Sequence, residues 1–219
     1  MHTAIAAALA GDRALAVRVD LRPPFAWSVA DTIDQLRGAN AYVEELPRRR
    51  RLVVAGATDL AANLATLAEP LRRRVVVDPR SGHVASGAFP ETVEVVHAWP
   101  DEWIETHPLG PTDAVVALSH DPRIDDRAIR AALASEAGHV AALGSRTTHQ
   151  ERLRRLAGVR GLDRLAGPAG LDLGAASLAD TALSIMAEVI AAENGRSGGR
   201  LRDGDLPIRA SAGLVPVAG

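Results

Sequence analysis

From residue 51 onward, short runs rich in valine and alanine alternate with longer segments whose apolar residues recur at helical spacing. The apolar runs predict five strands, RLVVAG (51–56), RRVVVDPR (73–80), VEVVHAWP (93–100), DAVVALSHDP (113–122) and GHVAALGSR (138–146). The other segments predict helices over residues 59–71, 125–135, 148–158 and 177–195. Strands that alternate with helices predict an α/β fold, a Rossmann-like doubly wound parallel sheet with helices on both faces.

Composition divides the chain into three predicted parts. Residues 1–46 predict a small α+β segment, with a short helix first and strand-like alternation in RALAVRVDL (13–21). Residues 47–196 predict the Rossmann-like domain, which begins with the charged run PRRRR (47–51), a solvated linker ahead of the first buried strand. Ser177 suits the N-cap of its last helix, and Gly195 suits the position just after that helix. Residues 197–219 predict a tail that is flexible or crosses onto a partner.

The 219-residue chain contains no cysteine, and its formal net charge is -2. The lack of cysteine excludes disulfides, thiolate metal sites and a cysteine nucleophile. The charge balance provides no field that would attract nucleic acid or an anionic membrane. No run of eighteen apolar residues occurs, so we expect a cytoplasmic protein with no membrane partner. Five histidines lack the spacing of a ligand set, and we expect no dedicated metal site; they are residues 2, 83, 97, 107 and 139.

The turn after the first predicted strand reads GATDLA, where dinucleotide-binding sheets usually carry G-x-G-x-x-G/A. Gly56 can make the tight turn, and Ala61 allows close packing of the helix. Thr58 stands where the middle glycine would let a pyrophosphate approach the backbone, and Asp59 adds a negative charge that repels phosphate. Asp78 follows Gly56 by 22 residues, close to the spacing of a carboxylate that bonds ribose hydroxyls. Gly56 and Asp78 therefore favour nucleotide binding, whereas Thr58 and Asp59 oppose it.

The motif SHDP (119–122) ends a predicted strand at the edge where open parallel sheets place their ligands. His120 could donate, accept or ligate there, and Asp121 could orient it. The alternative is an ordinary turn, in which Asp121 and Pro122 begin the next helix and His120 caps it.

The motif GSRTTH (144–149) ends the next predicted strand at the same edge. Gly144 and Ser145 begin a strand-to-helix turn whose free N–H groups can grip an anion, with Arg146 as a bidentate clamp. His149 lies one helical turn after Ser145 and could face the same space. The alternative is helix capping by Ser145 or Thr147 beside a surface arginine.

The loop GPAGLDLGAAS (167–177) carries four glycines around Asp172, so its backbone can approach a ligand or a second protein chain. The sequence assigns no catalytic residue. The candidate cofactor-binding residues are Gly56, Thr58, Asp78, His120, Asp121, Gly144, Ser145, Arg146, His149 and Asp172.

Three stretches together resemble the Rossmann domain of the XdhC/CoxI family: ALSHDPRIDDRAIRAAL, VAALGSRTTHQERLRRL and GPAGLDLGAASLADTALSIMAEVIAAENG. The preceding VVVDPRSG and FPETVEVVHAWPDE fit the family as well, so the resemblance spans residues 42–196. The resemblance implies a maturation factor for molybdenum hydroxylases such as xanthine and carbon monoxide dehydrogenases. Such a factor binds the molybdenum cofactor, helps it acquire its terminal sulfur and delivers it to the apoenzyme.

The resemblance also implies a ligand and partners. The ligand would be the molybdenum cofactor (molybdopterin) or NAD(P). Arg146 and the donors around Ser145 would grip its phosphate, and His120 and His149 would contact the polar ring or metal end. Asp78 would accept a ribose hydroxyl. The partners would be a molybdenum hydroxylase apoenzyme, a longer XdhC paralogue or a sulfur-donating enzyme, and a second copy in a homodimer.

Two features of the sequence depart from the family pattern. The family's first turn resembles G-A-G-H-V-A, whereas this chain has Thr58 and Asp59 in the third and fourth positions. Family members also carry a larger amino-terminal domain with a Cys-Gly-Gly segment, and here RGANAYVEEL stands at that place in a shorter region without cysteine. Such a chain cannot receive sulfur on a thiol of its own.

Two alternatives to a maturation factor follow from the sequence. An NAD(P)-dependent oxidoreductase would use the same fold, but the chain has no lysine and hence no Tyr-x-x-x-Lys pair. A non-catalytic scaffold paralogue with a degenerate site would act through contacts between chains, for example through the apolar face of residues 178–192. Burial against the sheet explains that apolar face equally well. We expect an accessory protein rather than a catalyst.

Overall fold

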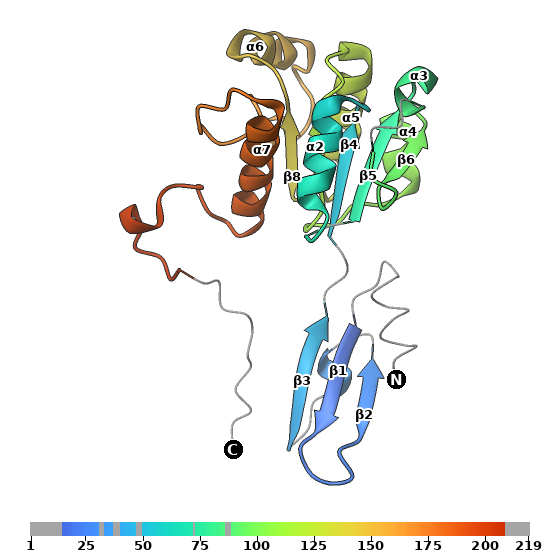
Figure 1. The fold of residues 1–219 in the computed structure, drawn as a ribbon, viewed down its shortest axis with the longest axis vertical. Coiled ribbons are helices and arrows are strands. Elements are labelled where there is room, and N and C mark those ends of the chain that lie inside the picture. Colours follow the sequence, from blue (N-terminus) through green and yellow to red (C-terminus); the bar gives the residue numbers. More distant parts are fainter. Residues whose placement is uncertain are drawn as a thin grey trace. The chain divides into compact units, whose positions relative to one another are not determined.

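The structure is a computed structural model that describes residues 15–30, 33–36, 40–46, 50–71, 73–85 and 89–208. The chain divides into two compact units, which meet in sequence between residues 49 and 50, and each is described separately (Figure 1). The short helix predicted at the start of the chain lies outside the described residues.

The first unit contains a three-stranded antiparallel sheet in the order β2-β1-β3. Its strands are β1 (Leu15–Asp20), β2 (Trp27–Ala30) and β3 (Ala41–Leu46), and a 3-10 helix, η1 (Ile33–Leu36), lies between β2 and β3 in sequence. The strand predicted from the alternation in residues 13–21 is therefore confirmed as β1. Val19 pairs with Trp27 on one side and Tyr42 on the other. Trp27 and Tyr42 are both exposed, so one face of this small sheet presents aromatic side chains.

The second unit is a six-stranded parallel sheet in the order β6-β5-β4-β7-β8-β9, with helices on both faces. This strand order is that of a Rossmann fold, and the predicted fold class is confirmed. The strands are β4 (Arg51–Ala55), β5 (Arg73–Asp78), β6 (Glu94–His97), β7 (Ala114–Ala117), β8 (His139–Ala142) and β9 (Leu165–Ala166). The sequence predicted the first five strands and missed β9, because a two-residue strand leaves no readable pattern.

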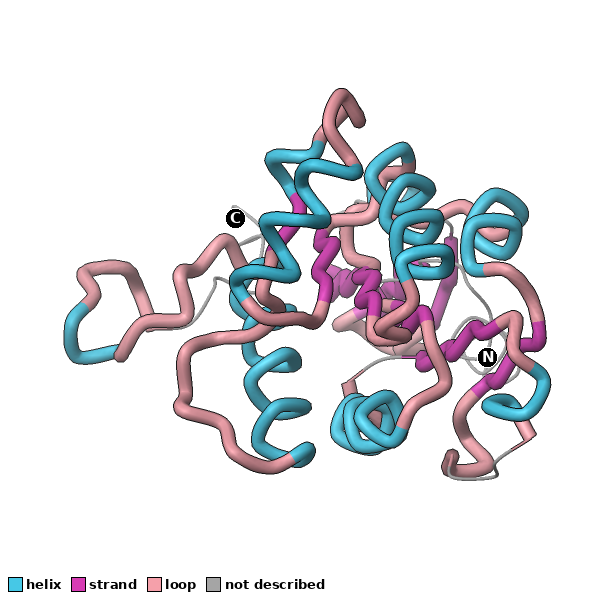
Figure 2. The backbone as a smooth tube through the Cα atoms, turned by 90° about the horizontal axis from the view of Figure 1, so that it is seen from above, coloured by secondary structure: helices cyan, strands magenta, loops and turns pink. Residues whose placement is uncertain are grey.

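Helices surround the sheet when it is viewed from above (Figure 2). They are α2 (Asp59–Ala68), α3 (Ser81–Val84), α4 (Pro100–Thr106), α5 (Pro122–Ala134), α6 (Arg146–Arg155) and α7 (Leu178–Glu193), with two 3-10 turns, η2 (Leu162–Arg164) and η3 (Leu201–Asp203). Ser177 caps α7 in a capping box with Asp180, and Gly195 follows that helix with a φ of 61°, as predicted. None of the described helices is long and apolar enough to cross a membrane.

The central strands direct alternate side chains into two separate cores. Leu52 and Val54 of β4 pack in the core that contains Ile185 of α7, whereas Val53 packs in the core that contains Ile129 of α5. All five of these side chains are fully buried. Burying each contributes roughly 1.5–3 kcal/mol of hydrophobic stabilisation, so the alternation fixes which face of the strand meets which helix layer.

Several predicted boundaries are wrong, and two of them have a clear local cause. The strand predicted over residues 93–100 ends at His97, and α4 begins at Pro100, because proline at a first helical position followed by Asp101 and Glu102 starts a helix. The helix predicted over residues 125–135 begins earlier, at Pro122. Asp121 is its N-cap, so the paired aspartates 125 and 126 lie inside the first two turns.

The prediction that the charged run 47–51 is a solvated linker is wrong for Arg51. This residue is the first of β4 and is only 4% exposed. Its guanidinium pairs with Asp113 at 2.9 Å and also donates to the carbonyl oxygen of Pro108. Asp113 in turn accepts hydrogen bonds from the backbone N–H groups of Arg51 and Gly110 at 2.8 Å each. A buried cation is retained here because a buried carboxylate compensates its charge.

Candidate functional site

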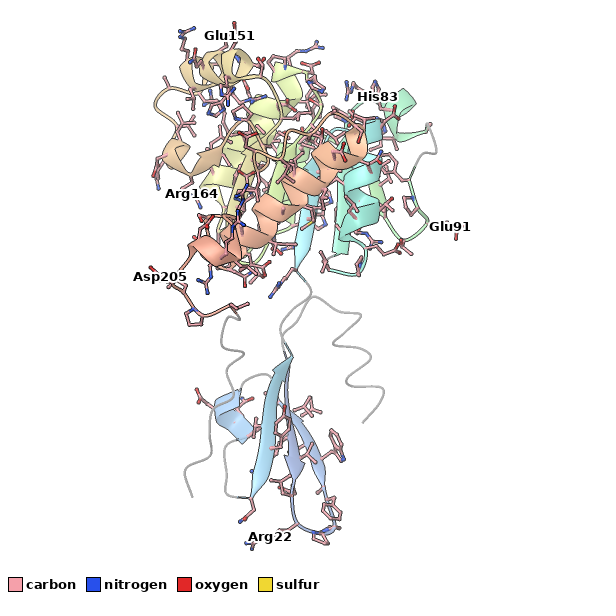
Figure 3. The ribbon with its side chains drawn as sticks, turned by 60° about the vertical axis from the view of Figure 1, so that its left-hand side comes forward. Arg22, His83, Glu91, Glu151, Arg164 and Asp205 are labelled. Atoms are coloured by element: carbon pink, nitrogen blue, oxygen red, sulfur yellow. The ribbon has the colours of Figure 1, made fainter. Side chains whose placement is uncertain are left out.

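The carboxyl ends of β4 and β7 mark the point at which the chain changes direction in the sheet. After β4 the chain adds β5 and β6 on one side, and then returns to place β7 on the other side. Ligands of open α/β sheets bind outside the strand ends at such a switch point. His83 of α3 and Glu151 of α6 lie at this end of the unit, away from Asp205 (Figure 3).

Gly56 forms the tight turn after β4 with a φ of 111°. A Cβ atom at this position would lie 2.6 Å from Cα of Ser119, in the turn after β7. Glycine is therefore required both by the backbone angle and by the close approach of the two turns. The Gly56 N–H donates to the carbonyl oxygen of Val77 in β5, so it is already used within the sheet.

Three further N–H groups of the first turn have partners. The Ala57 N–H donates to Oδ2 of Asp78 at 2.7 Å, and the Thr58 N–H donates to the Gly56 carbonyl. Thr58 is the N-cap of α2, since its Oγ1 accepts from the Ala61 N–H at 3.2 Å. In dinucleotide-binding folds this turn cradles a pyrophosphate, whereas here four of its N–H groups donate within the protein.

Asp78 ends β5 with its side chain fully buried, and four donors surround its carboxylate. Arg80 supplies three of them, through its backbone N–H and Nε to Oδ1 and through Nη2 to Oδ2, at 2.7–2.9 Å. The fourth donor is the Ala57 N–H. Burial raises the pKa of Asp78, but these hydrogen bonds outweigh burial and lower it below its ordinary value. A ribose hydroxyl could bond this carboxylate only by displacing one of the four donors.

Sequence reasoning missed Arg80, although it stands at the end of the predicted strand RRVVVDPR. The hydrogen bond with Asp78 is the main reason why the pKa of Arg80 is raised, and the negative charges of Asp121 and Asp125 contribute to the same shift. Arg80 therefore lies within electrostatic reach of the turn after β7. An arginine two residues after a strand-ending aspartate is the signal that could have identified it.

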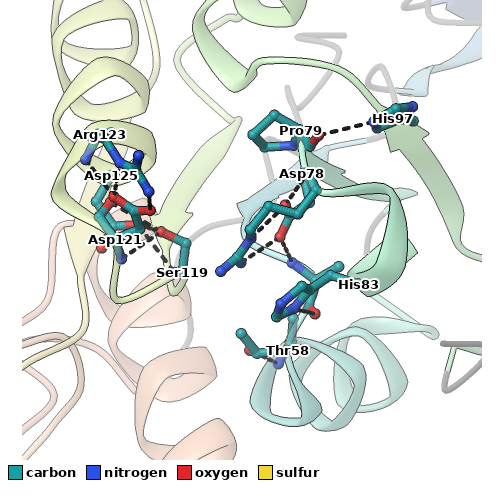
Figure 4. Close-up of polar contacts among 12 residues, drawn as sticks. Thr58, Asp78, Pro79, His83, His97, Ser119, Asp121, Arg123 and Asp125 are labelled. Atoms are coloured by element: carbon teal, nitrogen blue, oxygen red, sulfur yellow. Dashed lines mark hydrogen bonds and ion pairs between the residues drawn. The ribbon is translucent and has the colours of Figure 1, made fainter. Parts of the chain in front are cut away.

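The turn after β7 is built around Ser119 and Asp125 (Figure 4). The Ser119 N–H and Oγ both donate to Oδ1 of Asp125, at 3.1 and 2.6 Å. Asp121 caps α5 and also pairs with Arg123 at 2.7 Å, and the hydrogen bonds from Arg123 lower the pKa of Asp121 to about 2. His120 is exposed, with a φ of 61°. The alternative in which Asp121 and Pro122 begin the helix is confirmed, but the cap is Asp121 and not His120.

The turn before α6 contains the predicted anion clamp. Gly144 has a φ of 151°, and Ser145 caps α6 by accepting a hydrogen bond from the Thr148 N–H at 3.1 Å. Arg146 is exposed, and within the described residues its side chain makes no hydrogen bond or ion pair. Capping by Ser145 beside a surface arginine was the simpler of the two alternatives. Ligand binding by Arg146 stays a prediction.

The His149 ring lies against the loop that follows β9. A Cβ atom on Gly167 would collide with the His149 ring, so the ring lies directly over that backbone. Its Nδ1 is buried and has no hydrogen-bond partner in the described part of the chain. Burial, and then the charge of Arg152, lower the pKa of His149 below its ordinary value. The ring is therefore held neutral at pH 7.

Arg152 is a second residue that sequence reasoning missed. Its side chain is 3% exposed, Nη2 donates to the Leu143 carbonyl at 2.8 Å, and the same atom lies 3.7 Å from Asp125. Burial lowers the pKa of Arg152. The position shares a helix face with the buried Leu156, and this placement of an arginine on an apolar face was the available signal.

Asp172 lies in the loop between β9 and α7 and is exposed. Backbone hydrogen bonds join the loop to its neighbours, from the Ala169 N–H to the Ala142 carbonyl and from the Leu171 N–H to the Ser184 carbonyl. No described contact brings Asp172 to the other candidates. In contrast, Gly56, Thr58 and Asp78 meet around one turn. Among the described residues, no group of His, Asp and Glu side chains forms a set that could hold a metal ion.

Comparisons with known proteins agree with this architecture. Residues 52–189 match the model of the family described as the XdhC Rossmann domain. A Bacillus subtilis (strain 168) protein, named as a probable subunit of xanthine dehydrogenase, is 27% identical over 152 residues, which cover 69% of this chain and 45% of that protein. A crystal structure described as a xanthine dehydrogenase from Bacillus halodurans superposes with a TM-score of 0.70 at 22% identity, over 86% of this chain and 62% of that one.

This chain spans only part of both relatives, 45% of the Bacillus subtilis protein and 62% of the solved one. The solved structure supports the fold, and the family match supports the family, because it extends over more than half of the chain. The matched range, 52–189, begins in β4 and ends in α7, so it contains all of the parallel sheet except its first residue, Arg51. The chain therefore belongs to the family of the XdhC Rossmann domain.

Proposed function

We propose that this chain is an accessory protein of a molybdenum hydroxylase of the xanthine dehydrogenase type, and that it binds the molybdenum cofactor during maturation of that enzyme. The family match and a relative named as a probable subunit of xanthine dehydrogenase support the enzyme class. The observation that carries the proposal is the polar cluster at the switch point, where the turn after β4 contacts both Asp78 at the end of β5 and the turn after β7.

The residues present fit a pterin that carries a phosphate. Arg80 and Arg146 supply positive charge at the carboxyl edge, His120 is an exposed donor or acceptor, and Ser145 stands at a helix N-terminus. The bound cofactor would supply the metal centre that the hydroxylase needs. The chain's own residues would bind and orient the phosphate and pterin, and they offer no thiol that could carry sulfur, since there is no cysteine.

Binding of NAD(P) by an oxidoreductase is less well supported by the site. The N–H groups of Gly56, Ala57 and Thr58, which would face a pyrophosphate, donate within the protein. Asp78, which would accept a hydrogen bond from a ribose hydroxyl, already accepts hydrogen bonds from four donors within the protein. Dinucleotide recognition in this fold depends on both features being free.

The proposal is tested by purifying the protein from a host that makes molybdenum cofactor. Bound pterin is measured by fluorescence after oxidation, and bound nucleotide is measured by mass spectrometry in the same sample. Near-stoichiometric pterin is the expected result. NAD(P) without pterin would favour the oxidoreductase instead, and a ligand-free protein that still captures the hydroxylase would favour a scaffold.

A further inference from the structure

Arg80 is a cation that the structure holds in a fixed orientation at the switch point. Its Nε and Nη2 bond the two oxygens of Asp78 in parallel, at 2.9 and 2.7 Å. The Asp78 side chain is fully buried, and the Ala57 N–H ties the same carboxylate to the first turn. The guanidinium is therefore oriented before any ligand arrives, which reduces the entropy that binding would cost.

The outer side of this guanidinium remains accessible. The Arg80 side chain is 30% exposed, and Asp78 is the only partner of its guanidinium among the described residues. Guanidinium carries five N–H donors, and Asp78 takes only two of them, so Nη1 and one hydrogen of Nη2 can reach a ligand. Neighbouring N–H donors of this kind match two oxygens of a phosphate group.

The surroundings of Arg80 favour a single phosphate over a diphosphate. A dinucleotide turn offers several free backbone N–H groups to its pyrophosphate, whereas those of Gly56, Ala57 and Thr58 are used internally. Asp59, exposed in the first turn of α2, repels further negative charge on that side. A phosphomonoester presents three oxygens at one point, and a fixed arginine can bind it without those N–H groups.

We propose that Arg80 binds the phosphomonoester of a heterocyclic cofactor, either a pterin phosphate or a nucleoside monophosphate, and that Asp78 is the residue that positions it. This inference rests on the proposed function and names the chemical group that is recognised at that site. The inference also predicts that Arg80 contributes more to phosphate binding than Arg146 does. Arg146 has no partner among the described residues to orient it, so its side chain would have to be ordered on binding.

The test is a calorimetric titration with two matched ligand pairs. One pair is the oxidised phosphorylated pterin derived from molybdenum cofactor and the same pterin after phosphatase treatment. The other is adenosine 5′-monophosphate and adenosine. Phosphate is expected to strengthen binding by about 10- to 100-fold in at least one pair, the range for a hydrogen bond to a charged group.

Variants assign that gain to one arginine. Arg80→Ala is expected to abolish the difference within the pair, whereas Arg146→Ala keeps most of it and Arg202→Ala, 72% exposed and far along the chain, keeps all of it. Because Arg80→Ala leaves a buried carboxylate unpaired, the double variant Asp78→Asn/Arg80→Ala serves as a second test. Asp78→Asn alone removes a negative charge beside Arg80, which by electrostatics alone would strengthen phosphate binding. We expect it to weaken phosphate binding instead, because the guanidinium loses the partner that orients it.

The outcomes separate this inference from the proposed function. A phosphate effect that depends on Arg80 in the adenosine pair alone supports the inference and contradicts the cofactor assignment. Two outcomes overturn the inference and leave the proposed function standing. One is that the pterin binds equally well with and without its phosphate. The other is that pterin binding is lost in Arg146→Ala and kept in Arg80→Ala. Failure of all four ligands to bind overturns both.

Discussion

Gly56 and Ser119 lie so close together that a methyl group on Gly56 would be 2.6 Å from Cα of Ser119. This contact joins the turns after β4 and β7, the two adjacent strands at the switch point of the sheet. In many Rossmann folds the glycines of the first turn let the backbone approach a pyrophosphate. Here Gly56 serves the packing of one turn against another.

Replacing Gly56 by alanine is therefore expected to destabilise the second unit, because the new methyl group meets backbone atoms and the φ of 111° is strained for any L-residue. The two effects together cost about 2–4 kcal/mol. Urea denaturation followed by circular dichroism measures the change. Gly82→Ala is the control, since a Cβ there meets nothing within 4 Å, and its stability should be equal to or above that of the wild type. Equal stability of both variants would contradict the contact.

Asp113→Asn is expected to lower the free energy of unfolding by about 3–5 kcal/mol, because it removes the carboxylate charge that pairs with the buried Arg51. Asp203→Asn is the matched control, because that carboxylate is 64% exposed and its pair with Arg202 is a surface contact. The control should remain within about 1 kcal/mol of the wild type in the same denaturation experiment. If both variants lost the same free energy of unfolding, the buried pair of Arg51 and Asp113 would contribute no more to stability than a surface pair.

The stability difference between wild type and Asp113→Asn should depend on pH. Burial raises the pKa of Asp113, but hydrogen bonds from the Arg51 side chain and from the backbone outweigh burial and lower it in the folded state. Its stabilisation is thus fully present above the unfolded pKa of about 3.9 and is lost as the pH falls through the lower folded value. Urea midpoints of both proteins from pH 7 to pH 3 should converge below about pH 4. A difference between the two urea midpoints that stays constant down to pH 3 would contradict the lowered pKa of Asp113 in the folded state.

Thr58→Gly restores the glycine that a dinucleotide turn requires at this position. We expect its dissociation constant for NAD⁺ to stay within about threefold of the wild type, a difference of about 0.6 kcal/mol. The reason is that the Ala57 N–H remains bonded to Asp78 and the negative charge of Asp59 remains beside the turn. The lost cap costs only a few tenths of a kcal/mol. A tenfold gain in NAD⁺ affinity would show that Thr58 alone blocks the turn.

Most of the second unit could be predicted from sequence, because β4, β5, β7 and β8 are apolar runs between helical segments. The missed elements are short or begin with local signals, such as Pro100 at the start of α4. The pairing of Arg51 with Asp113 could not be predicted, since the two residues are 62 positions apart and meet only when β4 lies beside β7. The charged run around Arg51 gave a misleading indication of solvent exposure.

In the candidate site, too, some features could be predicted from the sequence and others could not. Sequence placed Gly56, Asp78 and Asp121 at strand ends, since the carboxyl ends of parallel strands share one edge. The sequence could not show that the Asp78 carboxylate accepts hydrogen bonds from Arg80 and Ala57, because hydrogen-bond partners depend on side-chain conformations that are set by the fold. Helix capping by Ser145 could be predicted, whereas the orientation of His149 toward Gly167 depends on a loop with no readable pattern.

The most direct test of the accessory role is to produce a molybdenum hydroxylase of the xanthine dehydrogenase type in one host with and without this chain. The cofactor content and specific activity of the purified hydroxylase are then compared at equal amounts of folded enzyme. We predict that without the chain the hydroxylase still accumulates but contains less cofactor and is proportionally less active. A hydroxylase with full cofactor content and full activity in the absence of the chain would contradict the accessory role.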